Sequence, residues 1–229
     1  MEPYYYQTLS KAEQSSYQAM QAGLQAFAPS FPVPLLENRA LTDVFMKLRL
    51  DCPQLFYAGT FQYRYYPDSR NAELIPAYLF EKGKLKEHQK ALQSRVEKLV
   101  RPVARCSDEE KLLYIHDFIC KNVRYDKLKK QYSHEIIGVL GHGVGVCEGI
   151  AKAVKILCDA LQIQCIIALA ENNPEKGVKY RHAWNVVRLD KKYYHLDCTF
   201  DLSLGNPEEI RYDYFLLSDK QIFRDHERL

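Results

Sequence analysis

One cysteine, one histidine and one aspartate stand in short sequence patterns whose side chains could react together. Cys147 follows the glycine-rich stretch 141–145 and opens a segment with helical hydrophobic spacing, which predicts a position in the first turn of a helix. Free backbone N–H groups and the helix dipole favour a thiolate at that end. The imidazole of His182 could move the proton, and the carboxylate of Asp197 could fix the orientation and tautomer of that ring. These three residue types suit nucleophilic acyl transfer.

The strands expected after this helix could bring the histidine and the aspartate together. After a polar loop, the alternating patterns of residues 181–189 and 193–200 predict two strands joined by a short turn. If they pair as a hairpin, His182 lies opposite the end of the second strand, one diagonal step from Asp197. Neighbouring strands are about 5 Å apart, so an imidazole–carboxylate hydrogen bond is feasible.

The three segments together resemble the transglutaminase-like superfamily of papain-related folds. The resemblance rests on the sequences Gly-Val-Cys-Glu-Gly-Ile-Ala, His-Ala-Trp-Asn and His-Leu-Asp-Cys-Thr-Phe-Asp, which occur in this order. Residues 122–126 and 212–219 are similar to the bacterial branch of that superfamily, so the resemblance covers about 107–226. It implies an α+β, papain/transglutaminase-like core in which the helix bearing the cysteine packs on an antiparallel sheet.

The resemblance also implies an activity. It predicts cysteine-dependent acyl transfer on protein or peptide amides, either as hydrolysis by a peptidase or amidase or as transglutamination. The predicted catalytic triad is Cys147, His182 and Asp197, with a thioester intermediate and no cofactor, and the chain has no calcium-loop pattern. The alternative is a non-catalytic scaffold or protein-binding module that keeps the fold without the reaction.

Further residues are candidates for the oxyanion hole and for the cleft. Papain-related enzymes often place an oxyanion donor shortly before the nucleophile, which makes His142 a candidate, although a solvent-exposed turn residue would fit the same position. The backbone N–H of Cys147 is a second candidate, because helix N-termini present such groups unsatisfied. Trp184 shares a strand face with His182, where it could pack in the core, exclude water from the triad, or do both. Tyr125 is expected to close the end of a helix near the cleft.

Other residues could compete for these roles. His195 could replace His182 as the base, and Asp201 could replace Asp197 as the orienting carboxylate. A metal site built from the triad is also conceivable, but the surrounding sequence fits a nucleophile better, so no metal is expected.

The first part of the chain predicts a small α+β subdomain without a chemical motif. Its expected elements are helices at about 10–27, 41–50 and 84–104 and strands at 54–66 and 72–80, with a proline-rich extended connector after the first helix. A boundary near 105 gives residues 1–105 a structural or cleft-forming role and residues 106–229 the transglutaminase-like catalytic domain. The second part begins with a capped helix at 107–121, and a buried strand is expected at 163–170.

Composition limits the possible partners. A hydrophobic content of 47% and a charged content of 27% are ordinary for a globular protein of 229 residues, and a net charge of +3 is too small to favour nucleic acid. The seven cysteines are scattered without a CxxC pair, as in reduced proteins. With no secretory signal and no apolar run of about 20 residues, we expect a cytoplasmic protein that does not enter membranes and acts on a protein or peptide substrate.

Overall fold

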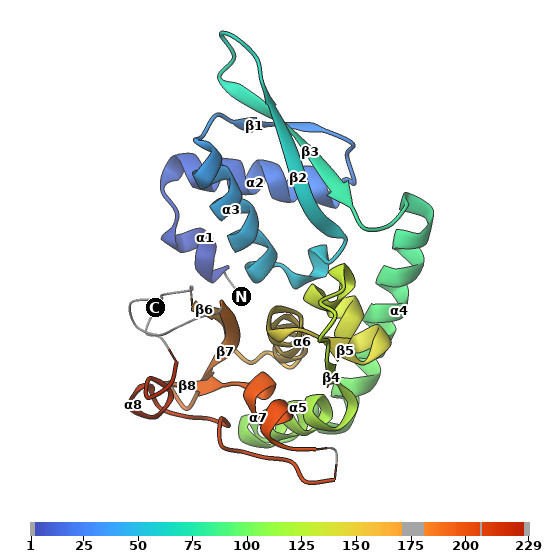
Figure 1. Ribbon diagram of the computed structural model, residues 1–229, viewed down its shortest axis with the longest axis vertical. Coiled ribbons are helices and arrows are strands. Elements are labelled where there is room, and N and C mark those ends of the chain that lie inside the picture. The colour runs from blue at the N-terminus through green and yellow to red at the C-terminus, as the bar shows by residue number, and fades with distance from the viewer. Residues whose placement is uncertain (1–2, 171–180, 207, 227–229) are drawn as a thin grey trace. The chain divides into compact units, whose positions relative to one another are not determined.

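The computed structural model describes residues 3–170, 181–206 and 208–226 of the chain (Figure 1). Helices occur together with antiparallel strands, which confirms the predicted α+β class. The chain divides into two compact units, Met1–Gln89 and Lys90–Leu229, so the division falls inside helix α4 (Lys82–Val100), whereas the sequence indicates a boundary near 105. Among the residues that the structure describes, no helix combines the length and apolar character needed to cross a membrane.

The first unit contains a three-stranded antiparallel sheet in the order β1-β3-β2. Its helix α2 begins with the capping box that the sequence predicts, formed by Ser10 and Glu13. Strand β1 replaces the expected proline-rich connector; its Pro32 and Pro34 are tolerated because β1 is an edge strand, where a missing N–H leaves no ladder bond unmade. The elements are α1 (Tyr4–Thr8), α2 (Lys11–Gln25), β1 (Phe31–Pro34), α3 (Asn38–Asp51), η1 (Pro53–Leu55), β2 (Ala58–Tyr65), β3 (Asn71–Tyr78) and the first half of α4.

The second unit contains all three residues of the predicted triad. After the rest of α4, its elements in chain order are η2 (Arg101–Val103), α5 (Asp108–Asn122), β4 (Arg124–Tyr125), η3 (Gln131–His134), the π-helical turn η4 (Ile137–Gly141), β5 (Val144–Gly145), α6 (Cys147–Ala160), β6 (Cys165–Ala170), β7 (His182–Leu189), β8 (Lys192–Leu196), α7 (Cys198–Leu204) and α8 (Asp219–Ile222).

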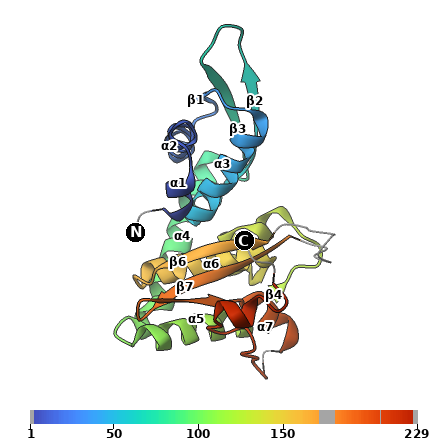
Figure 2. The ribbon, with the colours of Figure 1, turned by 90° about the vertical axis from the view of Figure 1, so that its left-hand side faces the viewer.

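Strands β6, β7 and β8 form an antiparallel sheet in that order, and Figure 2 shows β6 and β7 side by side. Strand β7 pairs with β8 up to the pair Leu189↔Lys192, and the turn between them is Asp190-Lys191. Both turn residues have positive φ, 49° and 68°, as the twist of a two-residue hairpin requires. The hairpin and its register agree with the sequence prediction. The polar loop expected at 171–180 lies outside the described residues.

Helix α6 packs on β6 and β7 and also contacts α5. Its apolar residues Ile150, Val154 and Leu157 are buried as the helical spacing predicts. Lys152 and Lys155, which the spacing places on the opposite side, are buried as well, because other segments cover that side of the helix. The arrangement confirms the expected core, in which the cysteine helix packs on an antiparallel sheet.

Candidate active site

Cys147 is the first residue of α6 and is partly exposed. The chain reaches it through β5, which pairs in parallel with β4. Gly143 turns the chain into β5 with a φ of 64°, and a Cβ atom there would lie 2.9 Å from the backbone oxygen of Asn122. Glycine is required at this position because it alone adopts this φ without strain beside a backbone atom.

The first turn of α6 touches the backbone of η3. The N–H of Val146 donates to the carbonyl oxygen of Ser133 at 3.0 Å. A Cβ atom at Gly149 would lie only 2.2 Å from the same oxygen, so no larger residue fits without a backbone shift. Position 149 therefore requires glycine for steric reasons. The close approach of Gly149 to Ser133 also fixes where the start of α6 lies against η3.

A buried ammonium group holds the same end of α6. The Nζ of Lys152 is completely buried and donates to Glu148 at 2.7 Å, to Glu135 at 3.0 Å and to the carbonyl oxygen of His134 at 3.1 Å. The Nδ1 of His134 lies 3.2 Å from the other carboxylate oxygen of Glu148. A buried charge needs such partners, and here they tie the η3 segment to the helix that begins with Cys147.

His182 and Asp197 meet at the end of the hairpin. The Nε2 of His182 lies 2.5 Å from the Oδ2 of Asp197. The prediction that the second strand continues to residue 200 is wrong: β8 ends at Leu196, and Asp197 is the N-cap of α7. Its Oδ1 accepts the N–H groups of Thr199 at 2.9 Å and Phe200 at 3.1 Å, a role for which aspartate is well suited. One carboxylate oxygen is fixed by the helix, and the other faces the imidazole.

The same imidazole also interacts with the thiol of Cys147, as the pKa of His182 shows. Burial acts to lower the pKa of His182, but side-chain hydrogen bonds with Asp197 and Cys147, together with their charges, raise this pKa to about 10. Because Nε2 is engaged by Asp197, Nδ1 is the ring nitrogen left for the sulfur. The structure therefore brings together the three residues that the sequence singles out.

A second histidine, not identified from the sequence, binds the same carboxylate. The Nε2 of His226 lies 2.9 Å from the Oδ2 of Asp197, and its side chain is 2% exposed. Burial acts to raise the pKa of Asp197, but the hydrogen bonds and charges of His182 and His226 outweigh it and hold this pKa below its ordinary value. No motif or periodicity marks His226, which stands far along the chain from the other members of the site.

Residues 97–198, a span that includes Cys147, His182 and Asp197, match the family model Transglut_core, the transglutaminase-like superfamily. The chain carries a transglutaminase-like domain. The resemblance inferred from three short motifs is therefore confirmed.

Solved structures similar to this chain include a TGase, with 12% identity over 74% of this chain and 50% of that chain and a TM-score of 0.40. A proposed cysteine protease from Cytophaga hutchinsonii has 15% identity over 61% of both chains and a TM-score of 0.38. A proposed protease from Parabacteroides distasonis ATCC 8503 has 14% identity over 61% of this chain and 36% of its own, with a TM-score of 0.36. The chain thus spans only part of each of these proteins. A comparison with curated proteins finds no match.

Trp184 covers one face of the His182 ring in the transglutaminase-like domain. The two rings are nearly parallel, with centroids 5.9 Å apart, and Trp184 is 1% exposed, so it is a core residue as well. Its Nε1 donates to the Nδ1 of His195 at 2.9 Å, and the Nε2 of His195 lies 3.1 Å from Asp219. Both ring nitrogens of His195 are therefore engaged away from Asp197, whereas the ring of His182 lies beside that carboxylate.

Asn185 connects the histidine strand to the cysteine helix. Its side chain is almost completely buried, and its Nδ2 donates to the carbonyl oxygen of Ala151 at 3.0 Å and contacts the sulfur of Cys165 at 3.4 Å. Ala151 lies in the second turn of α6, so this amide helps to set the distance between the Cys147 and His182 backbones. The sequence His-Ala-Trp-Asn contains this residue, but its contact could not be predicted.

The remaining predicted site residues lie near the surface. Tyr125 is 38% exposed, and burial, followed by the negative charge of Cys147, raises its pKa. Its role as a cleft residue stays a prediction. His142 is exposed, and its ring contacts Tyr132 with centroids 5.2 Å apart. Its role as an oxyanion donor stays a prediction, as does that of the Cys147 backbone N–H.

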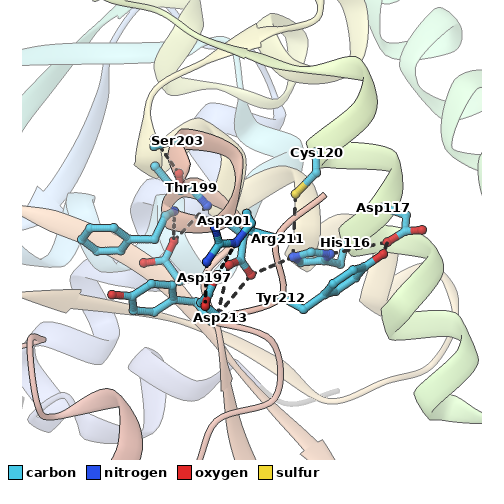
Figure 3. A network of polar contacts seen from close by, with 12 residues as sticks. His116, Asp117, Cys120, Asp197, Thr199, Asp201, Ser203, Arg211, Tyr212 and Asp213 are labelled. Atoms are coloured by element: carbon cyan, nitrogen blue, oxygen red, sulfur yellow. Dashed lines mark hydrogen bonds and ion pairs between the residues drawn. The ribbon is translucent and has the colours of Figure 1, made fainter. Parts of the chain in front are cut away.

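A separate polar network joins α5 to α7 (Figure 3). The Nε2 of His116 lies 2.9 Å from the Oδ2 of Asp201, both side chains are completely buried, and the carboxylate also accepts the N–H of Tyr214 at 3.1 Å. The sulfur of Cys120 lies 3.7 Å from the same ring, and burial raises the pKa of this thiol to about 12. Asp201 therefore anchors α7 to α5 and does not orient His182.

Two residues of the predicted triad, together with His226, form a group that could in principle hold a metal ion. Ligand atoms of His182, Asp197 and His226 all lie within 4.8 Å of one another. However, the Oδ2 of Asp197 is 2.5 Å from His182. Two ligands on one tetrahedral Zn²⁺ ion are about 3.3 Å apart, since each metal–ligand bond is about 2.0 Å. The spacing fits hydrogen bonds better than coordination.

Proposed function

We propose that this protein performs cysteine-dependent acyl transfer on protein or peptide amides. The observation that carries the proposal is one imidazole that lies 2.5 Å from the Asp197 carboxylate and interacts with the thiol of Cys147, the first residue of a helix in a transglutaminase-like domain. A thiol, a base and an orienting carboxylate are the parts of an activated nucleophile.

In the proposed reaction, the thiolate of Cys147 attacks the carbonyl carbon of the amide, and the carbonyl electrons move to the oxygen. Backbone N–H groups at the start of α6 stabilise this oxyanion, with that of Cys147 the main candidate. His182, protonated through its link to Asp197, donates a proton to the departing amine as the C–N bond breaks. The acyl group remains on the sulfur as a thioester.

The second half of the reaction returns the enzyme to its starting state. His182 removes a proton from water or from a primary amine, which attacks the thioester and releases the thiolate. Water gives a carboxylic acid, as in a peptidase or amidase, and an amine gives a new amide, as in transglutamination. The choice depends on how well the cleft excludes water and admits an amine.

Incubation of the protein with a peptide library tests this proposal, with and without a primary amine, followed by mass spectrometry. We expect cleavage or deamidation without the amine, or amine incorporation with it, and an acyl adduct on Cys147. The Cys147→Ser variant should lose product and adduct. Cys106 is the matched control, because it is the other free cysteine that is not buried; Cys106→Ser should react like the wild type. If Cys147→Ser keeps full activity, Cys147 is not the nucleophile and the proposal fails. If no substrate reacts, the scaffold alternative is favoured.

A further inference from the structure

His226 is the last residue that the structure describes, and its side chain is buried beside the proposed triad. Its backbone N–H bonds the carbonyl oxygen of Ile222 at 3.1 Å, which continues the turn of α8. Its ring is surrounded by aromatic rings, with centroid distances of 4.8 Å to Phe200, 4.9 Å to Trp184, 5.4 Å to His182 and 5.5 Å to Tyr214. Such a site holds the ring in one orientation.

Both ring nitrogens of His226 face carboxylate oxygens. The Nε2 lies 2.9 Å from Asp197, and the Nδ1 lies 2.7 Å from Asp225. The other oxygen of Asp225 accepts the hydroxyl of Tyr214 at 2.5 Å, which holds this carboxylate in place. An ionised carboxylate only accepts hydrogen bonds, so both contacts are satisfied when both nitrogens carry a proton. The geometry therefore favours a positively charged ring at this position.

A positive ring here acts on the most buried charge of the site. Asp197 is 1% exposed, and a buried carboxylate is costly unless every oxygen has donors. Within the described residues, Oδ1 has two backbone donors, whereas the donors to Oδ2 are the imidazoles of His182 and His226. When His182 gives up its Nδ1 proton during the reaction, its ring loses its charge while Nε2 still donates to Oδ2, and a protonated His226 is then the charged donor to that oxygen.

We infer that His226 is a positioning residue that keeps the Asp197 carboxylate ionised and aimed at His182 throughout the reaction. The inference deepens the proposed function and rests on it. The site then consists of a linked row, Cys147–His182–Asp197–His226–Asp225, in which a positive charge beyond the carboxylate balances the thiolate–imidazolium pair.

A charge effect and a packing effect predict different results. The titratable groups that face His226 are Asp197, Asp225, His182, Tyr214 and, more distantly, His195. Removing a positive charge makes every one of these groups easier to protonate. The pH profile of the site should therefore move to higher pH, by about one pH unit for a charge some 5 Å from His182. A purely structural role would lower activity at all pH values without moving the profile.

Two variants separate the charge from the hydrogen bond. His226→Gln keeps an N–H donor without charge, and His226→Phe keeps a ring that fits among aromatic neighbours but provides no donor. His195→Gln is the matched control, because His195 is also a buried histidine beside Trp184 and a carboxylate but does not bond Asp197. Near-ultraviolet circular dichroism would check that each variant is folded.

Two readouts should be measured on the full chain. The first is the rate of alkylation of Cys147 by iodoacetamide as a function of pH, and the second is the titration of the His182 ring by ¹⁵N NMR. In both His226 variants we expect the acid limb of the alkylation profile and the His182 midpoint to move upward by about one pH unit. The rate of the Phe variant should fall further, because Oδ2 loses a donor. His195→Gln should move neither readout.

The outcomes distinguish this inference from the proposed function. If Cys147 of the wild type reacts no faster than Cys106, the proposed nucleophile fails, and the His182 midpoint in His226→Gln still decides the role of His226. If Cys147 is fast but neither readout moves in the two His226 variants, the inference is overturned while the proposed function stands.

Discussion

Replacing Asp197 with asparagine removes one charge and keeps the shape of the side chain. The amide oxygen of the new side chain can still accept the N–H groups of Thr199 and Phe200, so α7 keeps its cap. The NH₂ group then stands where Oδ2 now accepts from His182. Because this nitrogen only donates, the Nε2 of His182 must become an acceptor, and the ring proton moves to Nδ1. Nδ1 is the nitrogen that faces the sulfur, so the ring can no longer accept a proton from it.

The size of the loss follows from the two contributions to the His182 environment. Without the carboxylate, the hydrogen bond and charge of Asp197 no longer oppose burial, and the pKa of His182 falls from about 10 toward its ordinary value of 6.5. At pH 8 the protonated fraction then drops from about 99% to about 3%, roughly 30-fold. A base held in the wrong tautomer loses up to about 10⁴-fold in rate. We therefore expect kcat/KM for acyl transfer at pH 8 to fall by roughly 30-fold to 10⁴-fold.

The assay compares kcat/KM of Asp197→Asn with the wild type on the best peptide from the library. Asp219→Asn is the matched control: Asp219 accepts a hydrogen bond from His195 at 3.1 Å but is 67% exposed, so its loss should leave kcat/KM nearly unchanged. Urea denaturation would show whether the variant is folded at pH 8. A folded Asp197→Asn protein with wild-type kcat/KM would refute the assignment of Asp197 as the group that orients His182.

Two further predictions concern stability. Gly149→Ala places a Cβ atom 2.2 Å from a backbone oxygen and should lower the free energy of unfolding by about 2 kcal/mol or more. Gly83→Ala, at a helical site with open space, should raise it by about 0.5–1 kcal/mol. Urea denaturation measures both variants, and equal effects would contradict the steric reasoning. The pKa of His182 is raised to about 10 because the folded protein binds the ring proton more tightly than the unfolded chain does. This stabilisation is fully present below about pH 6.5 and is lost as the pH rises through about 10. The free energy of unfolding should therefore fall by a few kcal/mol over this range. His182→Gln should remove most of that fall, and an unchanged pH dependence would contradict the contacts assigned to the ring.

The positions of Cys147 at a helix start and of His182 beside Asp197 could be predicted because their signals are local. A cysteine between glycines before a helical pattern, and a histidine and an aspartate on the two strands of a short hairpin, can be identified from neighbouring residues. The register of that hairpin follows from its short turn at Asp190-Lys191. Each of these features depends on only a few consecutive residues, so the sequence alone was enough.

The parts that could not be predicted depend on contacts between distant segments. His226 joins Asp197 only after the chain has passed through α7 and α8, and no pattern near His226 indicates a carboxylate partner. The end of β8 at Leu196 was missed because the alternation continues, while the capping preference of Asp197 ends the strand. Burial of Lys152 depends on Glu135, which lies outside its helix. In each case a tertiary contact overrides the local pattern.

The nucleophile itself can be tested by one measurement. Mass spectrometry after brief treatment with iodoacetamide at pH 6 gives the alkylation rate of every cysteine in the same sample. If Cys147 shares a proton with His182, it should react far faster than Cys106, the other cysteine that is not buried, and His182→Gln should abolish the difference. Equal rates for Cys147 and Cys106 in the wild type would contradict the proposal that Cys147 is an activated nucleophile.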